Sequence, residues 1–155
     1  MNIFRDPVLL IACGFGAGLS PKAPGTFGTL IAVPLYLVLE SLGLSIYLIV
    51  LVVASVGGIR ICSIASRKFG MHDCQQIVWD EIVGYWITMA AFPVSPENMV
   101  VGFLLFRVYD IFKPWPIRVI DRSVGGGLGI MLDDILAGIF GWISLYALIA
   151  VGWVG

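Results

Sequence analysis

Two apolar runs limit what this chain can fold into. Residues 42–59 and 135–154 each approach the roughly 20 apolar residues that a helix needs to cross a lipid bilayer. Four shorter apolar runs lie at residues 8–19, 27–39, 82–92 and 99–106. Charged residues make up only 12% of the 155 residues, against roughly 25% in soluble domains. So few charges cannot cover a water-facing surface, and we predict an integral membrane protein with a single domain over residues 1–155.

The apolar runs predict an all-α helical bundle of about five crossings, with short segments among them. The chain is placed across the membrane by Glu40, back by Ile59, across by Pro93, back by Phe112, and across again over residues 135–154. Eight basic residues then share one side: Lys22, Arg60, Arg67, Lys68, Arg107, Lys113, Arg118 and Arg122. Arg5 joins them if residues 8–19 are re-entrant or interfacial. Because cytoplasmic loops are enriched in Lys and Arg, this side is predicted to be cytoplasmic.

Turn and cap residues mark several helix ends. Ser95-Pro96 predicts a helix start, since proline is favoured at the first helical position. Asp73 and Gln76 have the spacing of a capping box, which predicts a second helix start at Asp73. Pro114 is expected to end the helix before it.

Several function classes are excluded by what the sequence lacks. The net charge of −1 and the absence of a basic stripe argue against a nucleic-acid partner. The three cysteines form no CxxC pair, which favours buried apolar side chains over a disulfide framework. His72 is the only histidine and has no neighbouring ligand for zinc.

Acidic residues fall where apolar segments begin or end. The topology brings five of them to the cytoplasmic side: Asp80, Glu81, Asp110, Asp133 and Asp134. Ionised groups beside a membrane segment are energetically unfavourable and usually face the bundle interior or a wet cavity. A bound divalent cation would relieve their mutual repulsion, and carboxylate oxygens suit Mg²⁺. The alternative is that these acids only stabilise the starts of helices.

Cationic side chains accompany these acids. Arg107, Asp110 and Lys113 are three residues apart and share one helix face, either as a local ion-pair ladder or as part of a phosphate site. The polar loop of residues 20–29 carries Lys22 and Thr26 and leads into an apolar segment. Such a loop can bind an anion at a helix N-terminus, or it can be a plain connector.

The residues favour one phosphatase chemistry over others. No cysteine lies six residues before an arginine, as a cysteine phosphatase would need, and no DxD motif follows a strand. Metal-assisted hydrolysis remains, with cations stabilising charge on the phosphoryl oxygens. Water or a carboxylate can act as the nucleophile in such a site.

At these motifs the chain resembles the phosphatidylglycerophosphatase A family. The matching stretches are GLSPKAPGTFGTL at residues 18–30, IVWDEIVGYWITM at 77–89, and FRVYDIFKPWPIRVIDRSVGGGLGIMLDDILAG at 106–138. The resemblance implies an all-helical Mg²⁺-dependent enzyme of the bacterial inner membrane. Its substrate would be the membrane phospholipid phosphatidylglycerophosphate, and its products phosphatidylglycerol and inorganic phosphate.

The resemblance also assigns residues. It implies that Asp80, Glu81, Asp133 and Asp134 are metal ligands or catalytic acids. It implies that the phosphate site is lined by Lys22, Thr26, Arg107, Asp110 and Lys113. Asp121 matches a motif as well, but a surface or capping role explains it equally.

Three alternatives remain open at this stage. Membrane-embedded acids also mark ion pathways, so a small ion or solute transporter is one alternative, although it predicts acids near the midplane and inverted repeats. A phosphatase of another lipid or of a soluble phosphate is the second, and a non-catalytic membrane scaffold is the third. The oligomeric state does not follow from the sequence.

Overall fold

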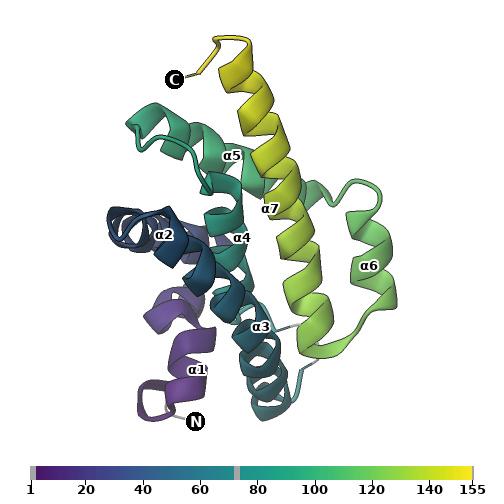
Figure 1. Cartoon of the computed structure of the whole chain (residues 1–155). Coiled ribbons are helices and arrows are strands. Elements are labelled where there is room, and N and C mark those ends of the chain that lie inside the picture. Colours follow the sequence, from purple (N-terminus) through teal and green to yellow (C-terminus); the bar gives the residue numbers. More distant parts are fainter. Residues whose placement is uncertain (1–2, 72–73, 155) are drawn as a thin grey trace.

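The computed structural model of the chain describes residues 3–71 and 74–154, and every element in these ranges is helical (Figure 1). The longer helices are α2 (Pro24–Ser41), α3 (Leu44–Phe69), α4 (Trp79–Met89), α5 (Pro96–Phe112) and α7 (Gly126–Ala150). The shorter ones are η1 (Ile3–Arg5), α1 (Pro7–Ala12), η2 (Gly14–Leu19) and α6 (Ile117–Ser123). The predicted all-α class is confirmed.

Within the described ranges, three helices are long and apolar enough to cross a membrane, namely α2, α3 and α7, with 18, 26 and 25 residues. Their outward faces expose large apolar side chains, among them Leu30, Val38, Ile49, Val52, Val53, Val56 and Ile143. In water such a surface would be unfavourable, whereas against lipid it is not. The fold is therefore that of a helical membrane bundle. With 11 and 17 residues, α4 and α5 are shorter, so the five-crossing topology stays a prediction.

Local signals set some helix ends and not others. The Ser95 side chain accepts a hydrogen bond from the Asn98 N–H at 3.0 Å, so the predicted start of α5 is confirmed. The same helix ends at Phe112, just before Pro114, as predicted. The capping-box prediction is wrong, because α4 begins at Trp79; Asp73 itself lies outside the described residues. The Val78 N–H instead donates to the Ala12 carbonyl at 2.9 Å, which holds the chain before α4 in a non-helical conformation against α1.

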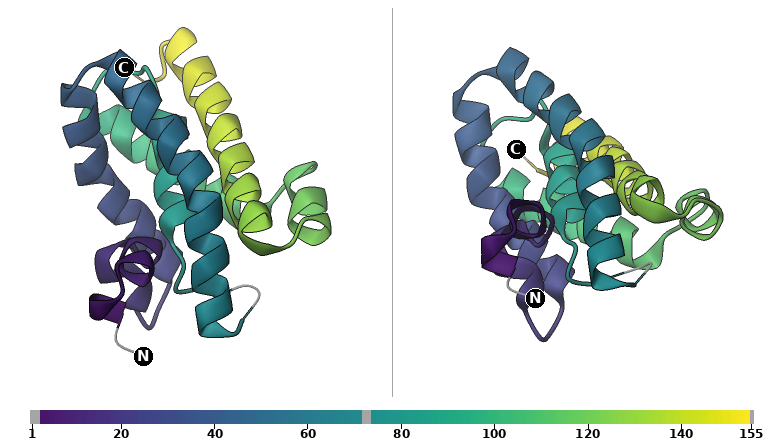
Figure 2. Two further views of the ribbon diagram at one scale, coloured as in Figure 1. Left: turned by 60° about the horizontal axis from the view of Figure 1, so that its bottom comes forward. Right: turned by 90° about the horizontal axis from the view of Figure 1, so that it is seen from below.

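Helix α4 lies at the centre of the bundle, in contact with α2, α3, α5 and α7 (Figure 2). Buried polar groups attach the surrounding helices to its backbone or to that of its neighbours. Tyr47 on α3 donates to the Trp86 carbonyl at 2.5 Å, and the Trp86 indole donates to the Ala32 carbonyl of α2 at 3.1 Å. Trp142 on α7 donates to the Ala90 carbonyl at 2.9 Å. These bonds satisfy polar groups that lipid cannot and fix the position of α4.

Glycines let α4 and α7 cross closely. A Cβ atom added to Gly84 would lie 2.7 Å from Phe106 Cζ and 2.9 Å from the Asp134 carbonyl oxygen. A Cβ on Gly138 would lie 2.5 Å from the Gly84 carbonyl oxygen, and one on Gly141 would lie 2.7 Å from Thr88 Oγ1. Small residues at a crossing bring two membrane helices into backbone contact. The register between α4 and α7 therefore depends on these glycines.

Gly84→Ala should destabilise the bundle, because the new methyl group meets backbone and an aromatic ring that cannot both move away. We expect a loss of about 1–3 kcal/mol, seen as a lower midpoint of thermal unfolding in detergent. Gly57→Ala on α3 is the matched control, since its Cβ would meet no atom within 4 Å. It should be neutral or stabilising by up to about 1 kcal/mol. Equal midpoints for the two variants would contradict the close crossing.

Candidate active site

The starts of α2, α4 and α7 meet the end of α5 and the helix α6 around one cavity of about 600 Å³. Seven of the predicted site residues line it: Asp80, Glu81, Arg107, Asp110, Lys113, Asp133 and Asp134. Lys22 and Thr26 are not among the lining residues; residues 23–25 between them form that wall instead. The site therefore gathers residues between positions 23 and 134 of the chain at one end of the bundle.

Three carboxylates form the centre of the cavity. One oxygen each from Asp80, Glu81 and Asp134 lie within 4.8 Å of one another. Asp134 is buried, and neither Asp80 Oδ1 nor Glu81 Oε2 has a hydrogen-bond partner among the described residues. Buried oxygens of like charge are unfavourable without a donor or a cation between them. The donor set, three carboxylates with two unpartnered oxygens, fits a hard divalent cation such as Mg²⁺.

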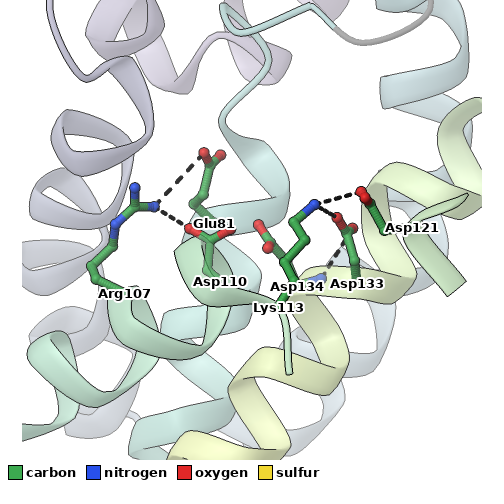
Figure 3. A network of polar contacts seen from close by, with 7 residues as sticks. All are labelled: Glu81, Arg107, Asp110, Lys113, Asp121, Asp133 and Asp134. Carbon is green, nitrogen blue, oxygen red and sulfur yellow. Dashed lines mark hydrogen bonds and ion pairs between the residues drawn. The ribbon is translucent and has the colours of Figure 1, made fainter. Parts of the chain in front are cut away.

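Arg107 lies beside this cluster. Its Nη1 atom contacts Asp110 Oδ2 one turn along α5 and lies 3.9 Å from Glu81 Oε1 (Figure 3). The ion pair with Asp110 is the local contact expected from the spacing on the helix. The approach to Glu81 joins α5 to α4, so Arg107 belongs to the site and not only to a ladder on its own helix.

Lys113 turns away from Arg107 and joins a second group of acids. It ends α5 in the left-handed conformation, and its Nζ lies 2.5 Å from both Asp121 Oδ1 and Asp133 Oδ2 (Figure 3). Burial alone would lower the pKa of Lys113, but hydrogen bonds to Asp121 and Asp133 outweigh it and raise this pKa above its usual value. Lys113 therefore stays positively charged and acts as a fixed countercharge.

Asp133 and Asp134 point to different partners although they are adjacent. Asp133 uses one oxygen for Lys113 and the other for the Asp134 N–H at 3.1 Å. Its carboxylate lies outside the cluster of three that suits a metal, so the structure favours Asp134 over Asp133 as a ligand. From the sequence, Asp121 was explained equally well as a surface acid. In the structure it lines the cavity and pairs with Lys113.

Gly25 is a site residue that the sequence analysis did not single out. It is the second residue of α2, and a Cβ atom there would collide with Glu81 Oε1 and lie 3.1 Å from Arg107 Nη1. The residue before Pro24, Ala23, is held at a φ of 48°, which turns the loop sharply into the helix. The N-terminus of α2 thus reaches the Glu81–Arg107 contact only because residue 25 has no side chain.

A cavity that combines clustered carboxylates with paired cations is typical of enzymes that bind a divalent cation and a phosphate group together. A model of the phosphatidylglycerophosphatase A family matches residues 10–149 of the chain. Phosphatidylglycerophosphatase A of Escherichia coli is 44% identical over 142 residues, covering 91% of this chain and 83% of that protein. The protein of the same name from Haemophilus influenzae is 43% identical over 145 residues, covering 92% of this chain and 89% of that protein.

A third relative carries a different name. A protein of Bacteroides thetaiotaomicron, provisionally named a phosphatidylinositol-3-phosphatase, is 39% identical over 145 residues and covers 88% of this chain and 90% of its own length. No solved structure matches the chain. The chain belongs to the phosphatidylglycerophosphatase A family, which confirms the resemblance of its motifs and supports a phosphatase.

Gly25→Ala should lower phosphatase activity without unfolding the protein. The new methyl group displaces the flexible end of Glu81 and crowds Arg107, while the helices around it need not move. A displacement of about 1 Å at a catalytic site can reduce the rate on the order of 10²-fold. Phosphate release and the thermal midpoint would be measured on the same preparation, with Gly57→Ala as the control. Full activity in Gly25→Ala would show that this close approach is unimportant.

Proposed function

We propose that the protein is a Mg²⁺-dependent lipid phosphatase that hydrolyses phosphatidylglycerophosphate to phosphatidylglycerol and inorganic phosphate. Its site would face the cytoplasm at the inner membrane of a bacterium. The observation that carries the proposal is the cluster of Asp80, Glu81 and Asp134, whose two unpartnered oxygens lie beside paired cations in one cavity. The identity of the lipid substrate is taken from the names of two relatives.

The charge of the cavity supports a role for divalent cations. Its described lining holds six carboxylates against three cationic side chains, a formal excess of three negative charges. A phosphate monoester carries close to two negative charges near neutral pH, so it would be repelled by the site alone. Divalent cations held by the three clustered carboxylates would reverse this repulsion, and they would polarise the phosphoryl group and activate water.

The chain's own residues have separate tasks in this proposal. Asp80, Glu81 and Asp134 would hold the cation. Arg107 and Lys113 approach from the two sides and stabilise negative charge on the phosphoryl oxygens as it redistributes. Overall, water adds across the bond between phosphorus and the lipid oxygen, which leaves as the alcohol of phosphatidylglycerol. Both oxygens of Asp133 are already bonded, so Asp133 positions Lys113 and the backbone of Asp134.

The alternatives now have less support. A transporter would need its acids near the midplane, whereas Asp80 and Glu81 lie in the first turn of α4 and Asp110 lies in the last turn of α5. Asp133 and Asp134 lie in the first half of α7, on the same side of its middle as the start of that helix. A scaffold would leave the buried unpartnered oxygens unexplained. A phosphatase of another lipid remains an alternative because of the third relative's name. That name also gives the second substrate to test.

Phosphate release from phosphatidylglycerophosphate in detergent should require Mg²⁺ and stop with chelator. Loss of a group that only supports a metal ligand lowers activity roughly 10–100-fold. Asp134→Asn removes a proposed ligand itself and should lower the rate by at least that much. Mn²⁺ binding, followed by electron paramagnetic resonance, should weaken in the same variant. Phosphatidylinositol 3-phosphate would be assayed in parallel, and a higher kcat/KM for it would replace the proposed substrate.

Glu97→Gln is the matched control for the loss of one carboxylate. Glu97 is exposed in the first turn of α5, at the end of that helix away from the cavity. Its removal should leave both turnover and Mn²⁺ binding unchanged. Turnover that persists with chelator would overturn the metal-dependent mechanism even if the lipid is correct.

The proposed orientation predicts where the C-terminus lies. Five crossings with a cytoplasmic site place the C-terminus on the periplasmic side. A fusion of alkaline phosphatase after Gly155 should therefore be active, and a fusion of green fluorescent protein at the same point should be dark. The reverse pair of results would exclude the proposed orientation.

A further inference from the structure

Among the described residues three cationic side chains line the cavity, and they are not equivalent. Arg107 contacts Asp110 and approaches Glu81, and Lys113 bridges Asp121 and Asp133. Both charges are thus largely balanced by the protein. Arg122, at the end of α6, lines the same cavity and is exposed, and it makes no ion pair with any acid in the described part of the chain. Its guanidinium can therefore bind an external anion.

The cavity is crowded on one side and open on the other. On the α2 side, residue 25 has no room for even a methyl group beside Glu81. On the side where α6 leads into α7, a Cβ atom on Gly126 would meet nothing within 4 Å, and the adjacent lining residues are Ser123 and Gly125. Helix α6 lies outside α7 (Figure 1). A bulky ligand therefore has more room on the side of Arg122 than on the side of Gly25.

Exposed apolar side chains lie at the end of α5 and in the loop that follows it. Ile111 lines the cavity and is 63% exposed, and Trp115, in the loop between α5 and α6, is 80% exposed. Exposed tryptophan is typical of the zone where lipid head groups meet hydrocarbon. A lipid whose head group enters the cavity can therefore keep its acyl chains in the membrane.

We propose that Arg122 binds the phosphodiester of the lipid substrate and so contributes to its affinity; this rests on the proposed function. Phosphatidylglycerophosphate carries a terminal monoester and an internal diester joined by glycerol. A cavity of about 600 Å³ has room for both, since small-molecule sites span roughly 300–1,000 Å³. Arg107 and Lys113 face the monoester, and the planar guanidinium of Arg122 pairs with the two free diester oxygens. Arg122 is a specificity-determining residue and not part of the hydrolytic step.

The test separates the two phosphates. Short-chain phosphatidylglycerol carries only the diester, and inorganic phosphate resembles only the monoester. Binding of each to the purified protein with Mg²⁺ would be titrated by calorimetry, beside turnover of phosphatidylglycerophosphate. Arg122→Gln should weaken phosphatidylglycerol binding about tenfold or more and raise KM with kcat nearly unchanged, while phosphate binding stays constant. Arg122→Lys should restore part of the affinity because the charge returns.

Arg118→Gln is the matched control, because it removes the same charge from the same helix at an exposed residue that does not line the cavity. It should behave as wild type. The inference is overturned if Arg122→Gln leaves phosphatidylglycerol binding intact, weakens both ligands equally, or matches Arg118→Gln. Absence of wild-type turnover would instead overturn the proposed function, and this assignment with it.

Discussion

The close crossing of α4 and α7 is the constraint on which both the bundle and the site depend. On each helix an acid lies four residues before a crossing glycine: Asp80 before Gly84, and Asp134 before Gly138. Residues four apart share a helix face, so the contact that brings the glycines together also brings the acids together one turn away. Asp133 lies one residue before Asp134 and so points roughly 100° away from it around the helix, toward Lys113. The crossing of α4 and α7 thus directs Asp134 into the carboxylate cluster and Asp133 toward Lys113.

The electrostatic balance of the cavity follows from this geometry. Asp110, Asp121 and Asp133 each contact a cationic side chain, so their charges are compensated within the chain. Asp80 and Glu81 instead keep buried oxygens without a partner among the described residues. A fold that stabilises some acids and leaves others uncompensated at one point concentrates its unsatisfied charge there. That concentration, more than the number of acids, is what favours a cation at this point and an anion beside it.

Sequence signals that act on whole segments predicted the structure well, whereas features that depend on contacts between distant residues were not predicted. The gathering of acids and bases at one end was predictable, because hydropathy and the positive-inside rule act on whole segments. That Asp134 and not Asp133 faces the centre was not recognised, although the spacing of Asp134 to Gly138 indicated it. The start of α4 was misplaced because a tertiary hydrogen bond to Ala12 prevailed over a local capping pattern. Gly25 was missed as a site residue because it matters through the side chain that it lacks beside Glu81. Arg122 was missed because it matters through having no acidic partner among the described residues. A sequence motif shows neither property.

The contrast between the closed and open sides of the cavity gives direction to catalysis under the proposed function. The substrate would be held at two phosphates, with the monoester against the carboxylates and the diester at Arg122. Hydrolysis removes the doubly charged group, so the lipid product keeps only the contact on the exposed rim, where solvent weakens an ionic interaction. Inorganic phosphate would be released in the polar interior of the cavity and would leave into water. Under this proposal the two products would part toward different phases, the lipid into the bilayer and phosphate into water, and neither would cross the path of the other.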